Sequence, residues 1–325
     1  MVFLNRHHEQ LAGEIEQAYI HTMSWYYSSH LSRYRACLAK LQILKYDRSA
    51  LLTSEGPMKR TEAAAPLQTI HGQDLTSLQL RAKILSERDA ALLNAFTVEV
   101  DKSIHGIEGV FRSFITAVFD NASAEYLFLV DFLSFRTADQ ISIDFHGIFQ
   151  DALITAEAFT KQLVEANFDC FGILICIRLV QQLAYDAQHR KVPVLDAFIN
   201  KLNILLWPRF QSAIDGHCES LRKASVLYKA PGDLNQSASP HPLSQKFSGL
   251  LLGLLLLTPE GGDDEPLANS ILRLRSEFEA CMTKISAKLG DSKTRERFLH
   301  NTFALVCAII NVRGQRNERT LIAGR

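Results

Sequence analysis

Apolar side chains recur every three or four residues over most of this chain, which is the spacing of amphipathic α-helices. Between Leu4 and Leu44 there is no proline, and only Gly13 interrupts good helix formers. A three-four apolar spacing is the seam along which a long helix packs on a partner. We therefore predict a coiled-coil-type helix within residues 1–52, with six seam positions as candidate interface residues: Ile20, Tyr27, Leu31, Tyr34, Leu38 and Leu41.

This first helix opens without a capping residue, so we expect the chain to begin inside a helix of a longer parent. Residues 53–92 follow as a predicted linker, because Thr53–Asp74 carries two prolines, two glycines and scattered charge. Since this linker separates the first helix from the rest of the chain, its seam has two interpretations. It packs within this chain, or it packs against a partner chain.

Residues 93–325 show helical patterning throughout. The segment Phe168–Val180 is apolar on nearly every side, which is typical of a helix in the middle of a bundle. Pro208 falls inside a helical pattern and predicts a kink. Leu267, Leu274 and Cys281 lie on a second heptad stripe, for which packing inside the chain is the favoured interpretation. The predicted fold class is all-α, with an elongated stack of antiparallel helices over residues 93–325.

Composition narrows the function classes. The chain has 325 residues, of which 47% are hydrophobic and 22% are charged, and its formal net charge is zero. These values are ordinary for a globular protein and argue against binding to nucleic acid. The most apolar stretch, Phe247–Leu257, is shorter than a bilayer-spanning helix, and the first residues lack the apolar core of a signal peptide. We expect a cytosolic location.

Motifs that carry chemistry are absent from the sequence. It contains no phosphate-binding loop, dinucleotide fingerprint, nucleophile elbow or zincin pair. Adjacent His7 and His8 point in different directions on a helix and are better explained as solvated side chains than as metal ligands. We therefore expect no catalytic residues, no metal and no cofactor. The helical seams favour an interaction protein over an enzyme.

Several stretches of the sequence resemble one known family. The most specific is Leu205–Phe210, which reads Leu-Leu-Trp-Pro-Arg-Phe. The other similar stretches follow in family order along nearly the whole chain: Phe3–Gln10, Tyr19–Ser24, Val110–Ser113, Asp120–Ser123, Glu125–Phe128, Phe168–Ile177, Arg190–Asp196 and, more weakly, Phe298–Asn301. Together they resemble the vacuolar protein sorting-associated protein 52 family.

The resemblance implies a helical-rod subunit of the Golgi-associated retrograde protein complex, which tethers endosome-derived vesicles at the trans-Golgi network. The implied partners are sister subunits of that complex and of the endosome-associated recycling complex, a Rab-type small GTPase and SNARE proteins. Membrane contact would be indirect and peripheral, at the cytosolic face of the trans-Golgi network and endosomes. The alternatives are a subunit of another helical-rod tether, such as an exocyst-like complex, or a helical GTPase regulator.

Two features depart from the family pattern. The resemblance begins at the last helix of the family's coiled-coil region, and the family's C-terminal helices end early, after Ile310, so we expect truncation at both ends. Within Leu205–Phe210, hereafter the hallmark stretch, three residues are better explained as structural: Trp207, Pro208 and Phe210. Arg209, a charge beside two aromatic residues, is the candidate for a buried or interfacial salt bridge.

Overall fold

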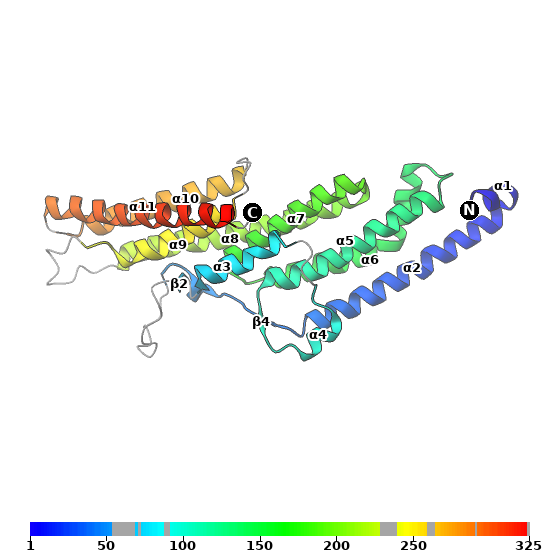
Figure 1. The fold of residues 1–325 in the computed structure, drawn as a ribbon, viewed down its shortest axis with the longest axis horizontal. Coiled ribbons are helices and arrows are strands. Elements are labelled where there is room, and N and C mark those ends of the chain that lie inside the picture. Colours follow the sequence, from blue (N-terminus) through cyan, green and yellow to red (C-terminus); the bar gives the residue numbers. More distant parts are fainter. Residues whose placement is uncertain are drawn as a thin grey trace. The chain divides into compact units, whose positions relative to one another are not determined.

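A computed structural model describes residues 1–53, 69–70, 73–87, 92–227, 239–258, 264–289 and 291–323. The described residues form eleven α-helices, three short 3-10 helices and two two-stranded sheets whose strands have two residues each (Figure 1). The predicted all-α class is confirmed. The chain divides into two compact units, each built from segments distant in sequence. The boundaries 1–52, 53–92 and 93–325 and the elongated stacking stay predictions.

Unit 1 comprises Met1–Lys45, Ile84–Glu165 and Gly172–Arg209. Its elements are α1 (Val2–His7), α2 (Glu9–Leu38), β1 (Gln42–Ile43), α4 (Ala95–Val100), β4 (Ile104–His105), α5 (Ile107–Phe132), α6 (Ala138–Val164), most of α7 (Cys170–Arg190), η3 (Pro193–Leu195) and the first part of α8 (Asp196–Leu227). Strands β1 and β4 pair in parallel.

Helices α2, α5 and α6 lie side by side and form the core of unit 1 (Figure 1). Phe145 and Phe149 of α6 stack with ring centroids 5.3 Å apart, and Phe114 of α5 meets Phe159 edge to face at 5.0 Å. These rings are fully or almost fully buried, so the apolar stripes of α5 and α6 face each other as their periodicity predicts.

Local sequence signals set the ends of the helices that frame this unit. Thr137 and Gln140 form a capping box that starts α6. At the end of α7, Lys191 adopts a positive φ of 59°, and Val192 N–H donates to the carbonyl of Ala187. This Schellman-type ending terminates α7 before the 3-10 turn that leads into α8.

Unit 2 comprises Tyr46–Lys83, Ala166–Phe171 and Phe210–Arg325. It contains η1 (Arg48–Ala50), β2 (Thr69–Ile70), β3 (Gln73–Asp74), α3 (Leu75–Ala82), the second part of α8, α9 (Pro242–Leu256), α10 (Glu265–Ser286) and α11 (Ser292–Ala323), and η2 (Lys83–Leu85) spans the boundary with unit 1. Strands β2 and β3 pair in an antiparallel hairpin. The range of the predicted linker, residues 53–92, contains β2, β3, α3 and η2. Most of its Thr53–Asp74 stretch lies outside the described residues.

Helix α9 packs on α10 and α11 in unit 2. Phe247 and Phe278 stack with ring centroids 4.0 Å apart, and Leu267, Leu274 and Cys281 of the second heptad stripe are buried. This confirms the interpretation that the second stripe packs inside the chain. Helix α8 continues through Pro208, so the predicted kink at this position stays a prediction.

Candidate functional site

The six seam positions predicted as candidate interface residues lie in α2 and the turn that follows it. Four of these positions are buried, namely Tyr27, Leu31, Leu38 and Leu41. The other two, Ile20 and Tyr34, are half-buried. The Tyr27 ring lies 4.4 Å from the Phe149 ring of α6. The Tyr34 hydroxyl donates to the Leu93 carbonyl. This chain's own helices therefore cover the seam, and contact of these positions with a partner chain stays a prediction.

A buried carboxyl group fixes α2 against α5. Glu125 of α5 is only 4% exposed and accepts hydrogen bonds from Tyr19 at 2.5 Å and Tyr27 at 2.8 Å. Burial, followed by the hydrogen bond to Glu125, raises the pKa of both tyrosines above its usual range. Both hydroxyls therefore stay protonated and donate to the carboxyl group, which satisfies a polar group that would be costly to bury alone.

A second polar cluster joins α2 to α6. The guanidinium of Arg136 donates to the buried Glu16 of α2. Asp144 of α6 lies in the same cluster, where burial and then the charge of Glu16 raise its pKa to about 6, against the opposing effect of Arg136. The positive charge of Arg136 thus acts on two carboxyl groups, those of Glu16 and Asp144. The cluster therefore carries a net negative charge when both carboxyl groups are ionised.

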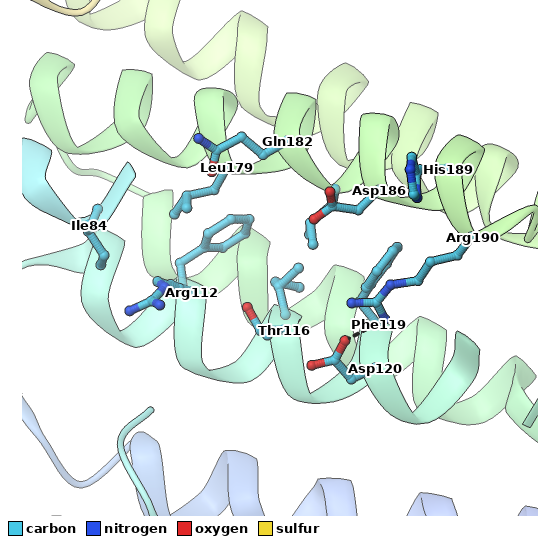
Figure 2. A pocket seen from close by; sticks show the side chains of 13 residues that line it. Ile84, Arg112, Thr116, Phe119, Asp120, Leu179, Gln182, Asp186, His189 and Arg190 are labelled. Carbon is cyan, nitrogen blue, oxygen red and sulfur yellow. Dashed lines mark hydrogen bonds and ion pairs between the residues drawn. The ribbon is translucent and has the colours of Figure 1, made fainter. Parts of the chain in front are cut away.

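Unit 1 contains a cleft between α5 and α7 with a volume of about 380 Å³. Figure 2 shows side chains of the two helices facing each other across it. Its apolar lining includes Phe111, Ile115 and Phe119 from α5 and Leu179 and Leu183 from α7. The volume is in the range of ligand-binding clefts. The three apolar side chains from α5 are almost fully buried, so polar groups form most of the surface of the cleft.

Polar contacts define both ends of this cleft. At one end, Arg190 donates to Asp120 at 2.7 Å and its guanidinium lies 5.1 Å from the centre of the Phe119 ring (Figure 2). At the other end, Gln182 and Arg112 each donate at 2.9 Å to backbone carbonyls of the segment Leu85–Glu87. Helices α5 and α7 and the segment Leu85–Glu87 therefore form the cleft. Hydrogen bonds from Gln182 and Arg112 attach this segment to the two helices.

The lining of the cleft contains hydrophobic, hydroxyl, carboxylate, amide, imidazole and guanidinium groups. Across the described ranges, no three His, Cys, Asp or Glu side chains gather closely enough to hold a metal ion. Its charged and hydrogen-bonding groups can bind a polar group of another molecule between α5 and α7.

The hallmark stretch lies within α8, where the two units divide between Arg209 and Phe210. Phe210 is fully buried, as a structural role predicts, whereas Trp207 is half-buried. Arg209 is half-buried and forms no ion pair with the described part of this chain. The buried salt bridge is therefore not found there, and an interfacial one stays a prediction.

Helix α7 is long and apolar enough to cross a membrane by length and composition alone. However, 72% of its most apolar window is buried within the protein. A core helix satisfies the same criterion, and the apolar side chains of α7 are accounted for by packing, as predicted for Phe168–Val180.

Sequence reasoning missed Glu125, Glu16 and the α5–α7 cleft. Glu125 falls at a helical position between the inward-facing Ala122 and Leu129, so a charged residue on an apolar stripe was the available signal. The cleft had no comparable signal, because its walls come from segments about 70 residues apart. Asp120 and Arg190, which meet at its end, belong to two of the stretches that carry the family resemblance.

Comparison with known proteins places these features in a family. Residues 21–321 match the family model described as Vps52, C-terminal. Vacuolar protein sorting-associated protein 52 of Schizosaccharomyces pombe is 32% identical over 311 residues, which are 95% of this chain and 60% of that protein. The Saccharomyces cerevisiae protein of the same name is 34% identical over 340 residues, covering 93% of this chain and 53% of that protein.

A plant relative extends the match. Vacuolar protein sorting-associated protein 52 A of Arabidopsis thaliana is 27% identical over 316 residues, covering 96% of this chain and 43% of that protein. The chain spans about half the length of the curated relatives it matches. Because the family model matches residues 21–321, well over half of the chain, the chain belongs to the Vps52 family.

Proposed function

We propose that this chain is part of a subunit of the Golgi-associated retrograde protein complex, a multisubunit vesicle tether acting in transport from endosomes to the trans-Golgi network. The same subunit would also serve endocytic recycling. The observation that carries the proposal is the match of residues 21–321 to the Vps52 family model. The names of the relatives place them in vacuolar protein sorting, which is the coarser process that contains this step.

We propose that the subunit works by protein–protein binding and not by catalysis. The α5–α7 cleft supports this mode, because its charged and hydrogen-bonding groups can receive a polar side chain of a partner.

The proposed partners are sister subunits of the retrograde complex and of the endosome-associated recycling complex, a Rab-type GTPase and SNARE proteins. The subunit would lie peripherally at the cytosolic face of the trans-Golgi network and endosomes, and its partners would mediate membrane contact. Nucleic acid is not among the proposed ligands, because the chain's 35 basic and 35 acidic residues leave no net positive charge.

Affinity purification of the tagged full-length protein from its own cells, followed by mass spectrometry, tests the proposal. We expect the sister subunits of the retrograde complex in near-equal amounts. Recovery of exocyst-type subunits would move the assignment to another tether. Recovery of no stable partner would contradict a function based on assembly. An unrelated tagged protein of similar abundance is the control.

A further inference from the structure

Two carboxyl oxygens at the contact between α2 and α6 are shielded from water and have no hydrogen-bond partner in the described part of the chain. They are Oε1 of Glu16 and Oδ2 of Asp144. A buried polar atom without a partner costs about 1–3 kcal/mol, so native proteins contain few of them. Two such oxygens at one helix contact point to a partner that the ionised side chains do not supply.

Two ionised carboxyl groups cannot satisfy each other, because each is only an acceptor, whereas a protonated carboxyl group also donates one hydrogen bond. The carboxyl groups of Asp144 and Glu16 lie within hydrogen-bonding reach of each other. The second oxygen of Glu16, Oε2, accepts from the guanidinium of Arg136. One proton between Oε1 of Glu16 and Oδ2 of Asp144 therefore gives both oxygens a partner.

The charged groups around this pair leave it with an excess of negative charge. Glu16 and Arg136 are the charged side chains that act on Asp144. His146 of α6 hydrogen-bonds to the Ser142 carbonyl of its own helix at 2.6 Å. The residues one helical turn from the pair carry no charge: Ala12, Gly13, Tyr19 and Ile20 on α2, and Gln140, Ile141, Gly147 and Ile148 on α6.

The other elements packed against α2 carry charges that are bonded elsewhere or exposed. Glu125 of α5 accepts hydrogen bonds from two tyrosines of α2. Asp131 of α5 and Arg6 and His7 of α1 are exposed. Helix α4, with the exposed Glu99, lies near the opposite end of α2 (Figure 1). One guanidinium thus faces two carboxyl groups, and one bound proton balances the charge.

The pKa of Asp144 agrees with a proton held at this place. Burial and then the charge of Glu16 raise this pKa to about 6, against the effect of Arg136. An aspartate of an unfolded chain has a pKa of about 4. At pH 5 the folded protein therefore keeps a proton here that the unfolded chain has mostly lost.

The first half of α2 has few buried apolar side chains. Within Glu9–Tyr26, two residues are buried, Ala12 and Glu16, against three larger ones in the second half of the helix. Tyr19 adds its hydrogen bond to Glu125. A segment with few buried apolar contacts opens locally more readily than the rest of a protein. The state of Glu16 therefore influences how often the first half of α2 opens.

We propose that Glu16 and Asp144 bind one shared proton, and that this proton is a latch that holds the first half of α2 on α6. With the proton in place, a hydrogen bond between the two carboxyl groups joins the helices, and Arg136 balances the remaining charge. Without the proton, both buried oxygens lack a partner and the first half of α2 opens more often. The inference goes beyond the proposed function and does not depend on it, because every group of the latch belongs to unit 1.

Amide hydrogen exchange of the full-length protein, measured by mass spectrometry at pH 5 and pH 7.5, tests the latch. Rates are divided by the intrinsic exchange rates at each pH. Peptides from Glu9–Tyr26 should then exchange about fivefold faster at pH 7.5 than at pH 5. Peptides from the buried stretch Leu267–Cys281 of α10 are the internal control and should exchange equally at both pH values. Equal exchange of the α2 peptides at both pH values overturns the proposal.

Substitutions at position 144 separate a shared proton from simple charge repulsion. Asp144→Asn supplies a permanent N–H donor, so the first half of α2 should exchange slowly at both pH values. Asp144→Leu has a similar size and also removes the charge, but it offers no donor to Glu16. Its α2 peptides should exchange about fivefold faster than those of Asp144→Asn at both pH values.

Asp151→Asn, at an exposed position of α6, is the matched control and should keep the pH dependence of the parent protein. Equally slow exchange in Asp144→Asn and Asp144→Leu would show that removal of the charge is sufficient, which overturns the shared proton. A pH dependence that survives in Asp144→Asn would assign the titration to another group and also overturns the proposal.

Discussion

The hydroxyl of Tyr27 donates to the carboxyl group of Glu125 at 2.8 Å across the interface between α2 and α5. The two residues are 98 positions apart in sequence, so this bond joins the first long helix to the body of unit 1. A donor to a buried carboxyl group contributes more than an ordinary hydrogen bond, and its loss leaves part of the carboxyl group unsatisfied.

Tyr27→Phe should therefore lower the free energy of unfolding by about 1.5–3 kcal/mol. The measurement is urea denaturation followed by circular dichroism. Tyr26→Phe is the matched control, since Tyr26 is 44% exposed and adjacent in sequence, and it should change stability by less than about 0.5 kcal/mol. Equal effects of the two substitutions would show that the hydrogen bond from Tyr27 to Glu125 does not add to the free energy of unfolding.

The Asp144 cluster predicts a pH dependence of stability. The pKa of Asp144 is raised to about 6 in the folded protein, above the value of about 4 expected for an unfolded chain. The folded state therefore binds more protons than the unfolded state between these two values, and this contribution to stability falls as the pH rises from about 4 to 6. Above pH 6, the ionised Asp144 repels Glu16 and destabilises the α2–α6 contact.

Asp144→Asn should stabilise the protein by about 1 kcal/mol at pH 7.5, after allowance for the partial exposure of the side chain, and by much less at pH 4.5. Urea denaturation at the two pH values measures the difference. Asp151→Asn, at an exposed position of the same helix, is the control. A stabilisation that is the same at both pH values would contradict the assigned pKa.

Glycine at position 253 is required by close packing within unit 2. A Cβ atom there would lie 2.5 Å from the Phe171 ring and 2.9 Å from Leu78. Gly253→Ala should therefore destabilise the protein by about 1–3 kcal/mol through overpacking. Gly13→Ala on α2 meets no atom within 4 Å and should stabilise it by about 0.5–1 kcal/mol. Thermal melting of the two variants in opposite directions is the expected result.

Two aspartates test the difference between buried and surface ion pairs. Asp169 is buried and pairs with Arg81 at 2.6 Å, whereas Asp120 is 48% exposed and pairs with Arg190 at 2.7 Å. Asp169→Asn should cost about 3 kcal/mol, because it removes a charged partner from a largely buried guanidinium. Asp120→Asn should cost less than about 1 kcal/mol. Similar losses in chemical denaturation would refute this ranking.

The sequence was sufficient to predict the helices, but not which elements pack against each of them. The buried stripe through Leu267 and Leu274 could be predicted directly, since it follows from local periodicity. The capping box of Thr137 and Gln140 is also a local signal, although it was not among the predicted features. The seam of α2 could not be assigned, because a heptad stripe looks the same whether α6 or another chain covers it. The proline and glycine content of Thr53–Asp74 suggested a linker over residues 53–92, and this interpretation did not foresee helix α3 at Leu75–Ala82.

The interaction sites required the fold for a different reason. Phe119 and Leu179 line one cleft only because α5 and α7 lie together in unit 1, and no local pattern links them. Trp25 of α2 is 66% exposed, and the sequence alone could not show this, because either face of the helix could have been the buried one. Tertiary packing decides which of two apolar faces remains available to a partner.

Transport of an endosome-derived cargo to the trans-Golgi network tests the central claim most directly. Cells depleted of the full-length protein would be compared with the same cells expressing it again, and the arrival of a labelled cargo at the trans-Golgi network would be timed by microscopy. The account predicts that cargo accumulates in vesicles and endosomes on depletion and that arrival recovers on re-expression. Arrival at the normal rate in depleted cells would contradict a role in retrograde tethering.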